Sequence, residues 1–294
     1  RQPPMNFTKL QGAGNDFILV EADKQLNWSK LAIAMCHRHF GIGADGLLLL
    51  SSEKTALKMR MFNPDGSEAE ACGNGLRCLV KYALHKGLVD SQVAEISVTT
   101  KAGIRKARLH TKGNKTIIQT GMGEPKFGAK DIPVALEPGA DSSSKPILDY
   151  PLTIEGRKLA LSFVSMGNPH AVYFVEQPVA DFPLSQIGPG VERHPLFPNR
   201  TNFEVARVLE HNQIEARVWE RGVGETLACG SGACAIAIIA IIAKLHGYTD
   251  GKVDIKLPGG TLSVEWDGAG EVFLSGPAEI VFSGEWSDEN IATD

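Results

Sequence analysis

Hydrophobic and polar positions change their spacing repeatedly along this chain, and each change predicts a new element. Short apolar or alternating runs bounded by Gly, Pro, Asn and Asp are typical of strands. In the first half, such runs predict strands at residues 6–10, 17–20, 47–50, 57–62, 95–99, 103–110 and 116–120. Helical spacing predicts a helix from Trp28 to His39, with Ser29 as its candidate cap, and a second helix that follows Cys72 and ends near Gly87.

The second half repeats this order of elements. Its predicted strands lie at residues 159–164, 171–175, 203–209, 213–220, 253–257, 261–266 and 271–274. The apolar run from Ala233 to Ala243 predicts a buried helix, because it is shorter than the ~20 residues of a membrane span. The stretch from Gly188 to Asn202, rich in Gly and Pro, predicts a loop.

The two halves therefore form a weak internal repeat of about 150 residues. The repeat predicts an α+β fold of two similar domains, residues 5–121 and 122–276, with the active site in the cleft between them. The tail after Gly276-Pro277 fits either domain on pattern alone.

Composition narrows the function classes. A formal net charge of −4 and a pI near 6.1 argue against nucleic acid as a main partner. Residues 1–12 are polar and show no secretory signal, and no run is long enough for a membrane span. Five cysteines without a CxxC spacing favour free thiols in a reducing cytoplasm and argue against a structural zinc site, so no metal is expected.

A cysteine lies in the same small-residue frame in each half, Ala71-Cys72-Gly73-Asn74-Gly75 and Ala228-Cys229-Gly230-Ser231-Gly232. Each frame precedes a helical run, so each thiol is expected at a helix N-terminus, where free N–H groups favour the thiolate and bind anions. Two such thiols facing one ligand suggest a proton removed from one side of a carbon and returned on the other, without pyridoxal phosphate. The alternative, a buried inert thiol, is our interpretation for Cys36, Cys78 and Cys234.

Polar residues in the loops are candidates for substrate binding. Glu220-Arg221 precedes the second frame and suits a zwitterionic group, because Arg offers a planar fork to a carboxylate and Glu accepts from an ammonium. A surface ion pair is the alternative. His170 either orients a thiol or is a structural histidine. Asparagines in the Gly-rich loops are either turn residues or pocket-lining groups: Asn15, Asn63, Asn74, Asn168 and Asn202.

These residues together resemble the diaminopimelate epimerase family. The resemblance runs in order from Met5 to about Gly284 and is carried by Gly14 to Phe17, Phe40 to Gly46, Phe62 to Ser67, Cys72 to Cys78, Gly167 to His170 and Glu220 to Gly232. It implies a cofactor-independent epimerase that interconverts LL- and meso-2,6-diaminopimelate in lysine and cell-wall biosynthesis.

The resemblance also implies a fold and a set of roles. Each domain would be a mixed sheet curled around a central helix, residues 277–290 would return to the first domain, and Phe282 would lie at a homodimer contact. Cys72 and Cys229 would be the acid–base thiols. The carboxylate at the reacting carbon would be held by Gly73, Asn74, Gly230 and Ser231. The rest of the substrate would be bound by Asn15, Asn63, Asn168, Asn202, Glu220 and Arg221, while His170 and Glu220 would tune the thiols.

The chain departs from the family at Gly46, where some members carry a substrate-binding Gln, and at Ser231, where Thr is commoner.

Alternative functions remain. A proline or hydroxyproline racemase shares the two-thiol logic, although Glu220-Arg221 favours a substrate with a second zwitterionic end. Phenazine-pathway isomerases of similar architecture lack the cysteine pair. A thiol-dependent redox or acyl-transfer protein would use one cysteine asymmetrically, and a non-catalytic binding protein would need no activated thiol.

Overall fold

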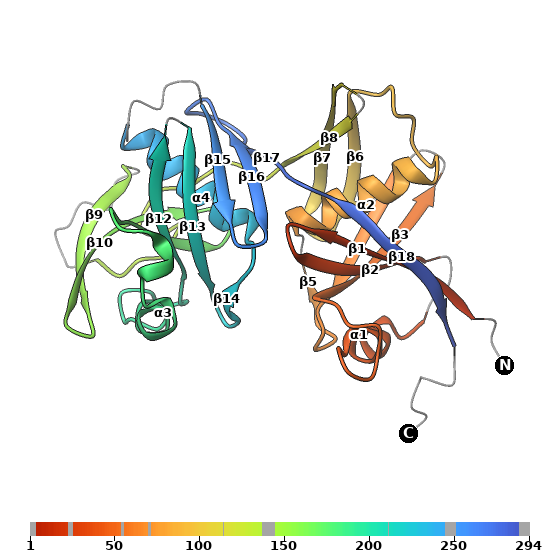
Figure 1. Cartoon of the computed structure of the whole chain (residues 1–294), viewed down its shortest axis with the longest axis horizontal. Helices are drawn as coiled ribbons and strands as arrows, with labels where there is room; N and C mark the ends of the chain where they lie inside the picture. The colour runs from red at the N-terminus through yellow and green to blue at the C-terminus, as the bar shows by residue number, and fades with distance from the viewer. Residues whose placement is uncertain are drawn as a thin grey trace. The chain divides into compact units, whose positions relative to one another are not determined.

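The chain folds into two compact units (Figure 1). The first contains residues 1–121 and 275–294, and the second contains residues 122–274. The computed structural model describes residues 4–22, 26–53, 56–69, 72–113, 115–136, 145–210, 212–244 and 251–287. Residues 288–290 of the predicted returning segment lie outside these described residues.

A mixed β-sheet forms most of the first unit. Its strands lie in the order β18-β1-β2-β3-β4-β6-β7-β8; β2–β3 and β4–β6 are parallel pairs and the other pairs are antiparallel. The short β5 pairs with β4. The elements are β1 (Met5–Gly12), β2 (Asn15–Glu21), α1 (Trp28–Cys36), β3 (Gly46–Glu53), β4 (Ala56–Phe62), β5 (Glu68–Ala69), α2 (Gly73–His85), β6 (Glu95–Thr100), β7 (Gly103–Lys112), β8 (Lys115–Gly121) and β18 (Glu279–Trp286).

Both faces of this sheet are covered, which explains the unbroken apolar runs at residues 17–20 of β2 and 47–50 of β3. On β2, Phe17 and Leu19 belong to the core around α2, whereas Ile18 and Val20 belong to the core beneath α1. Successive side chains of a strand point to opposite faces, so a strand buried on both faces needs an unbroken apolar run. The helix α2 contacts β1, β2, β3, β4, β7, β8 and β18, so the sheet curls around it.

The second unit repeats this arrangement around α4, which contacts β10, β11, β12, β15 and β16. Its order β9-β10-β11-β12-β13-β15-β16 has the same succession of parallel and antiparallel pairs as β18 to β7. The predicted α+β class is confirmed. The elements are β9 (Ile147–Ile154), β10 (Arg157–Ser165), β11 (Pro169–Phe174), η1 (Val179–Asp181), α3 (Leu184–Glu192), β12 (Asn202–Glu210), β13 (Gln213–Glu220), β14 (Gly224–Thr226), α4 (Gly230–Ile242), β15 (Lys252–Leu257), β16 (Gly260–Glu265) and β17 (Phe273–Ser275).

The structure corrects the first part of the loop predicted from Gly188 to Asn202, whereas residues 193–201 do lie outside the helices and strands. The helix α3 extends through Gly188, Pro189 and Gly190 to Glu192. Its apolar residues Leu184, Ile187 and Val191 follow helical spacing and are buried in the core of the second unit. Their burial outweighs the poor helix propensity of the Gly-Pro-Gly segment.

The predicted helix at Trp28 ends at Cys36 rather than His39, and its cap is Asn27 instead of Ser29. The Asn27 side chain accepts a hydrogen bond from the Lys30 N–H over 3.2 Å, as an N-cap residue does. Ser29 instead donates to the Gly66 carbonyl and ties α1 to the turn after β4.

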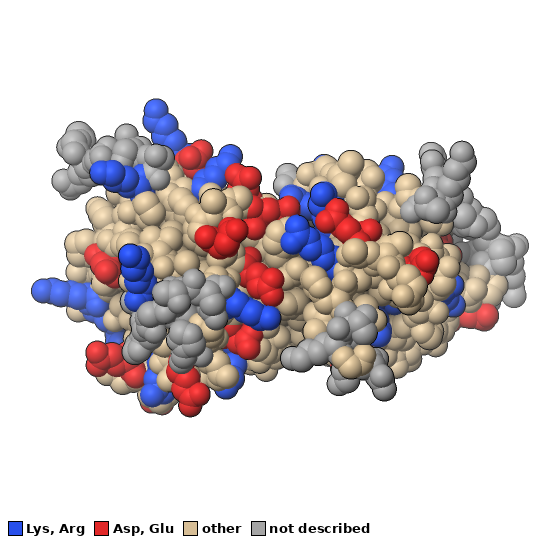
Figure 2. All heavy atoms as spheres, turned by 90° about the horizontal axis from the view of Figure 1, so that it is seen from above, with Lys and Arg blue, Asp and Glu red and all other residues tan. Residues whose placement is uncertain are grey.

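No helix within the described residues is both long enough and apolar enough to cross a bilayer. Figure 2 shows basic and acidic side chains interspersed over one face of the molecule, as expected for a chain with a formal net charge of only −4.

Candidate active site

Cys72 and Cys229 are the N-cap residues of the two central helices. Both have an extended backbone, with φ −138° and ψ 125° at Cys72 and φ −131° and ψ 117° at Cys229. The carbonyl of each accepts the first helical hydrogen bond, from Leu76 over 2.8 Å and from Ala233 over 2.9 Å. The Gly that follows each cysteine opens its helix, so each thiol lies beside free first-turn N–H groups.

Two predicted asparagines surround Cys72. The half-buried thiol donates to Asn15 Oδ1 over 3.7 Å, and Asn74 Nδ2 donates to the same oxygen over 3.1 Å. Asn74 also accepts a hydrogen bond from Arg77, a fully buried residue outside the predicted set. The first frame therefore joins Cys72, Asn15 and Asn74 in one polar cluster.

The other predicted groups of the first unit contact different residues. Asn63 donates to Ser67 Oγ over 2.9 Å within the turn after β4. Gly46 begins β3, where a Cβ would lie 3.1 Å from Met61 Cε and 3.2 Å from the Phe62 carbonyl oxygen. This close packing leaves little room for the Gln that some family members carry there.

A longer chain of polar groups leads away from Cys229. Its sulfur lies 3.5 Å from Ser231 Oγ, and Asn168 Nδ2 donates to that hydroxyl over 3.3 Å. Asn168 Oδ1 lies 2.9 Å from His170 Nε2, and His170 Nδ1 lies 2.7 Å from Glu204 Oε1. Four predicted residues, Cys229, Ser231, Asn168 and His170, are thus linked to Glu204, which lies outside the predicted set.

Glu204 and His170 form a fully buried pair. Burial raises the pKa of Glu204 above its usual 4.5, although the adjacent His170 opposes this shift. A lone acidic residue in the apolar segment Phe203 to Ala206 was the available sequence signal for this pair.

The thiol of Cys229 does not follow the expectation that a helix N-terminus favours the thiolate. The Gly232 N–H does donate to its sulfur over 3.4 Å. Burial nevertheless raises the pKa of Cys229 well above 9.0, and the charge of Glu220 raises it further. Desolvation therefore outweighs the helix terminus at this thiol.

Asn202 holds the segment that carries Glu220 and Arg221. Its amide oxygen accepts from the Arg221 N–H over 2.8 Å, and its nitrogen donates to the Pro169 carbonyl over 3.1 Å. The Arg221 guanidinium donates to the Asn199 carbonyl, and Thr226 Oγ1 donates to Glu220 Oε1 over 2.6 Å. Glu192, a buried residue absent from the predicted set, anchors the same segment by accepting from the Gly222 N–H over 2.9 Å.

Phe282 is 48% exposed on β18, and its ring packs edge-on against Phe7 at a centroid distance of 6.0 Å. Its role at a homodimer contact stays a prediction. Within the described ranges, no three His, Cys, Asp or Glu residues gather as ligands for a metal ion.

The chain shares its sequence with a known family. Residues 7–128 and 162–281 match the family described as diaminopimelate epimerase. The diaminopimelate epimerase of Moorella thermoacetica is 45% identical over 288 residues, with 96% of this chain and 99% of that protein covered. The enzyme of the same name from Pelotomaculum thermopropionicum is 46% identical over 288 residues, with the same coverage of both chains.

Solved structures extend the likeness of fold beyond close relatives. A phenazine biosynthesis protein of the PhzF family from Bacillus anthracis has a TM-score of 0.68 at 19% identity, with 97% of this chain and 99% of that chain covered. The sequence matches extend over nearly the whole chain and include both cysteine frames. The chain therefore belongs to the diaminopimelate epimerase family.

Proposed function

We propose that this protein interconverts LL- and meso-2,6-diaminopimelate, with Cys72 and Cys229 as the two acid–base groups and without a cofactor. The observation that carries the proposal is the duplicated N-cap. Two units of the same topology each present a thiol at the start of the central helix. One thiolate would take the α-proton while the other thiol supplies a proton to the opposite side of that carbon.

The helix N-termini support this chemistry on the carboxylate side. Charge moves onto the substrate carboxylate as the α-proton leaves, and N–H groups aimed at it lower the energy of that state. Gly73 and Asn74 in one unit and Gly230 and Ser231 in the other would supply these donors, since they form the first turns beside the thiols.

The remaining predicted residues would bind the rest of the substrate. Glu220 and Arg221 offer an acceptor for an ammonium and a donor fork for a carboxylate. Asn202 supports them, because it fixes the backbone of Arg221. Asn15, Asn63 and Asn168 would contribute amide groups, and His170 and Glu220 would tune the thiols.

The proposal extends to the setting of the protein. The reaction would supply lysine and peptidoglycan precursors in the cytoplasm, where the five cysteines, none of which forms a disulfide, stay reduced. A homodimer would form through β18 around Phe282, so Phe282→Asp should shift the mass measured by light scattering from that of a dimer to that of a monomer.

Replacement of single cysteines tests the function. Cys72→Ala and Cys229→Ala should each abolish interconversion of LL- and meso-diaminopimelate, a loss of at least about 10³-fold in kcat. Cys36→Ala is the matched control, because burial raises the pKa of Cys36 to about 12 and Cys36 lies in the core beneath α1. Full activity in either active-site variant would rule out the two-thiol reaction. Turnover of L-proline but not of diaminopimelate would show that the proposed substrate is wrong.

A further inference from the structure

A chain of amide groups beside Cys72 ends in two charged residues. Arg77 donates to Asn74 Oδ1, and Asn74 Nδ2 donates to Asn15 Oδ1 over 3.1 Å. Asn15 Nδ2 then donates to Asp45 Oδ2 over 2.9 Å. The chain therefore runs from a buried guanidinium on α2 to a carboxylate just before β3, and the Cys72 thiol bonds to its middle.

The charged ends determine which way each amide points. An amide keeps its shape when its oxygen and nitrogen exchange places, so its partners decide the orientation. A guanidinium has only donors and an ionised carboxylate has only acceptors. Arg77 therefore requires the oxygen of Asn74, and Asp45 requires the nitrogen of Asn15. With both ends fixed, Asn15 presents its oxygen to the Cys72 sulfur.

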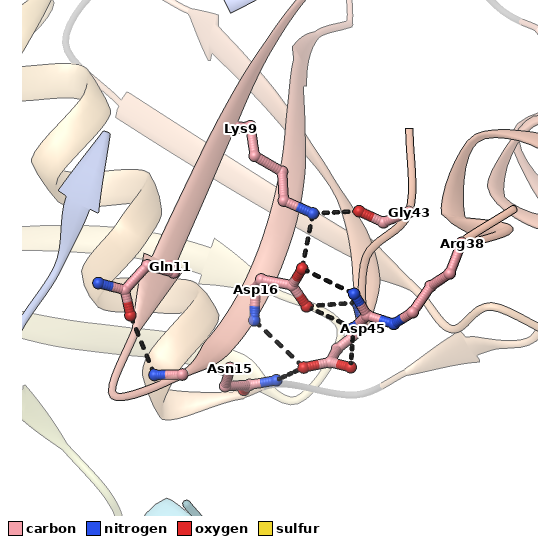
Figure 3. A network of polar contacts seen from close by, with 8 residues as sticks. Lys9, Gln11, Asn15, Asp16, Arg38, Gly43 and Asp45 are labelled. Carbon is pink, nitrogen blue, oxygen red and sulfur yellow. Dashed lines mark hydrogen bonds and ion pairs between the residues drawn. The ribbon is translucent and has the colours of Figure 1, made fainter. Parts of the chain in front are cut away.

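Asp45 is itself held in place by the network in Figure 3. Arg38 Nη2 donates to Asp45 Oδ1 over 2.8 Å, and the Asp16 N–H donates to Asp45 Oδ2 over 3.2 Å. Arg38 also forms two hydrogen bonds to the Asp16 carboxylate, to which Lys9 donates as well. The segment between α1 and β3 is thereby fixed to the start of β2, where Asn15 lies.

We propose that Asp45 and Arg77 are positioning residues that fix the Asn15 amide with its oxygen toward the Cys72 thiol. An acceptor at this place bonds to the S–H form and gives nothing to the thiolate, so it favours the protonated thiol. The inference rests on the proposed acid–base role of Cys72. It adds that two residues outside the predicted binding set orient the amide that accepts the Cys72 S–H.

The rate at which iodoacetamide alkylates Cys72, followed by peptide mass spectrometry without substrate, tests the proposal separately from the enzyme's function. Asp45→Ala removes the acceptor of Asn15 Nδ2, so only Asn74 still orients the Asn15 amide and its N–H groups turn toward the sulfur more often. The Cys72 rate at pH 7 should then rise about threefold to tenfold, the range expected for one hydrogen bond. Arg38→Ala removes the ion pair at Asp45 Oδ1 but keeps the carboxylate, whose Oδ2 still accepts from Asn15 Nδ2 and the Asp16 N–H. Glu95→Ala removes surface ion pairs with Lys106 and Arg108 in the same unit.

Both control variants should stay within about twofold of the parent rate. Cys78 is buried in the core of the same unit, so its alkylation rate reports any general loosening of the fold. The decisive quantity is the ratio of the Cys72 rate to the Cys78 rate. A ratio that rises in Asp45→Ala alone supports the proposal. A ratio that is unchanged in Asp45→Ala, or that rises equally in Arg38→Ala, overturns it.

Discussion

Cys72 and Cys229 begin equivalent helices, but different side chains lie beside them. In the first unit, the third residue after the cysteine faces apolar groups. A Cβ on Gly75 would lie 3.2 Å from Leu48 Cδ2 and 3.6 Å from Phe17 Cζ. The start of α2 is therefore packed against the hydrophobic core of its unit.

The equivalent positions in the second unit are occupied by a buried histidine and a buried glutamate. Phe17 on β2 pairs with Gly46 on β3, and Leu48 is two residues further along β3. In the same way, His170 on β11 pairs with Asn202 on β12, and Glu204 is two residues further along β12. A Cβ on Gly232 would lie 3.1 Å from Glu204 Oε1. The two units therefore have the same backbone arrangement here, but the apolar pair Phe17 and Leu48 of the first unit corresponds to the titratable pair His170 and Glu204 of the second.

This exchange changes how an asparagine amide is oriented beside each thiol. Asn15, the first residue of β2, and Asn168, which directly precedes β11, both follow a glycine. Asn15 is fixed by Asp45 and, through Asn74, by Arg77. Asn168 is instead fixed by His170, whose ring nitrogens donate or accept a hydrogen bond according to the tautomer.

Both ring nitrogens of His170 face oxygen atoms, those of Asn168 and Glu204. This arrangement requires a proton on Nε2 and a second proton between Nδ1 and Glu204 Oε1. In the other tautomer of His170, Nε2 is an acceptor and the Asn168 amide would have to turn. The first unit therefore orients its amide through a carboxylate and a guanidinium, and the second through a histidine whose hydrogen-bonding role depends on its tautomer.

The largest predicted loss of stability comes from placing a glutamate at Leu48, the position in the first unit that corresponds to Glu204. Leu48→Glu buries a carboxylate beside Phe17 with no histidine to pair with it. We expect a loss of about 3–5 kcal/mol in the free energy of unfolding, measured with urea at pH 7. Leu48→Met is the volume-conserving control and should lose less than about 1.5 kcal/mol. Equal losses in the two variants would show that the site tolerates an acid.

Asp16 should contribute stability only when it is charged. Burial opposes ionisation of Asp16, but hydrogen bonds from Arg38 and Lys9 prevail and lower its pKa from 3.8 to about 2. Its contribution, about 2 kcal/mol before screening by solvent, is present above pH 3.8 and is lost as the pH falls through about 2. Unfolding of the parent and Asp16→Asn at pH 2 to 5 should therefore converge at the acid end, and a constant difference would contradict this origin of the stability.

The contribution of Glu204 to stability should depend on pH in the opposite direction to that of Asp16. Because burial raises its pKa, its contribution to stability is present below pH 4.5 and is lost as the pH rises through the raised value. Glu204→Gln cannot ionise, so its stability relative to the parent should improve between pH 4 and 8, by about 1.4 kcal/mol for every pH unit that separates the folded and unfolded pKa values. A parallel pair of stability–pH curves would mean that His170 compensates the charge completely.

The smallest predicted effect is a difference in stability between alanine variants of Gly75 and Gly232, the last glycines of the two cysteine frames. Gly75→Ala places a methyl group against apolar Leu48, and the better helix propensity of Ala offsets the close contact. Gly232→Ala places the methyl against the Glu204 carboxylate oxygen and should lose about 1 kcal/mol more in thermal or urea unfolding. Equal changes in the two variants would argue that the polar pair adapts as readily as the apolar one.

The sequence was most informative where one residue type has one structural use. The unbroken apolar runs at residues 17–20 and 47–50 are strands buried on both faces, and both cysteine frames are helix starts. The helix α3 was missed, because tertiary packing overrides the poor propensity of Gly188, Pro189 and Gly190.

The polar partners of the site were missed for a different reason. Glu204 meets His170 across 34 positions of sequence, and Asp45 meets Asn15 across 30. These contacts depend on the register of parallel strand pairs, which local patterns do not encode. Composition and spacing can therefore suggest the thiols and the asparagines beside them, but not Asp45 and Glu204, which contact those residues from distant positions in the sequence.

Deuterium incorporation tests the central claim that two thiols share one reaction. LL-diaminopimelate would be incubated with the protein in D₂O, and the α-protons of substrate and product would be followed by NMR from the first few per cent of conversion. If each thiol serves one side of the carbon, the newly formed meso product carries solvent deuterium at the inverted carbon while the remaining LL substrate keeps its proton. Equal labelling of recovered substrate and product from the start, or product that retains the original proton, would contradict the two-thiol reaction.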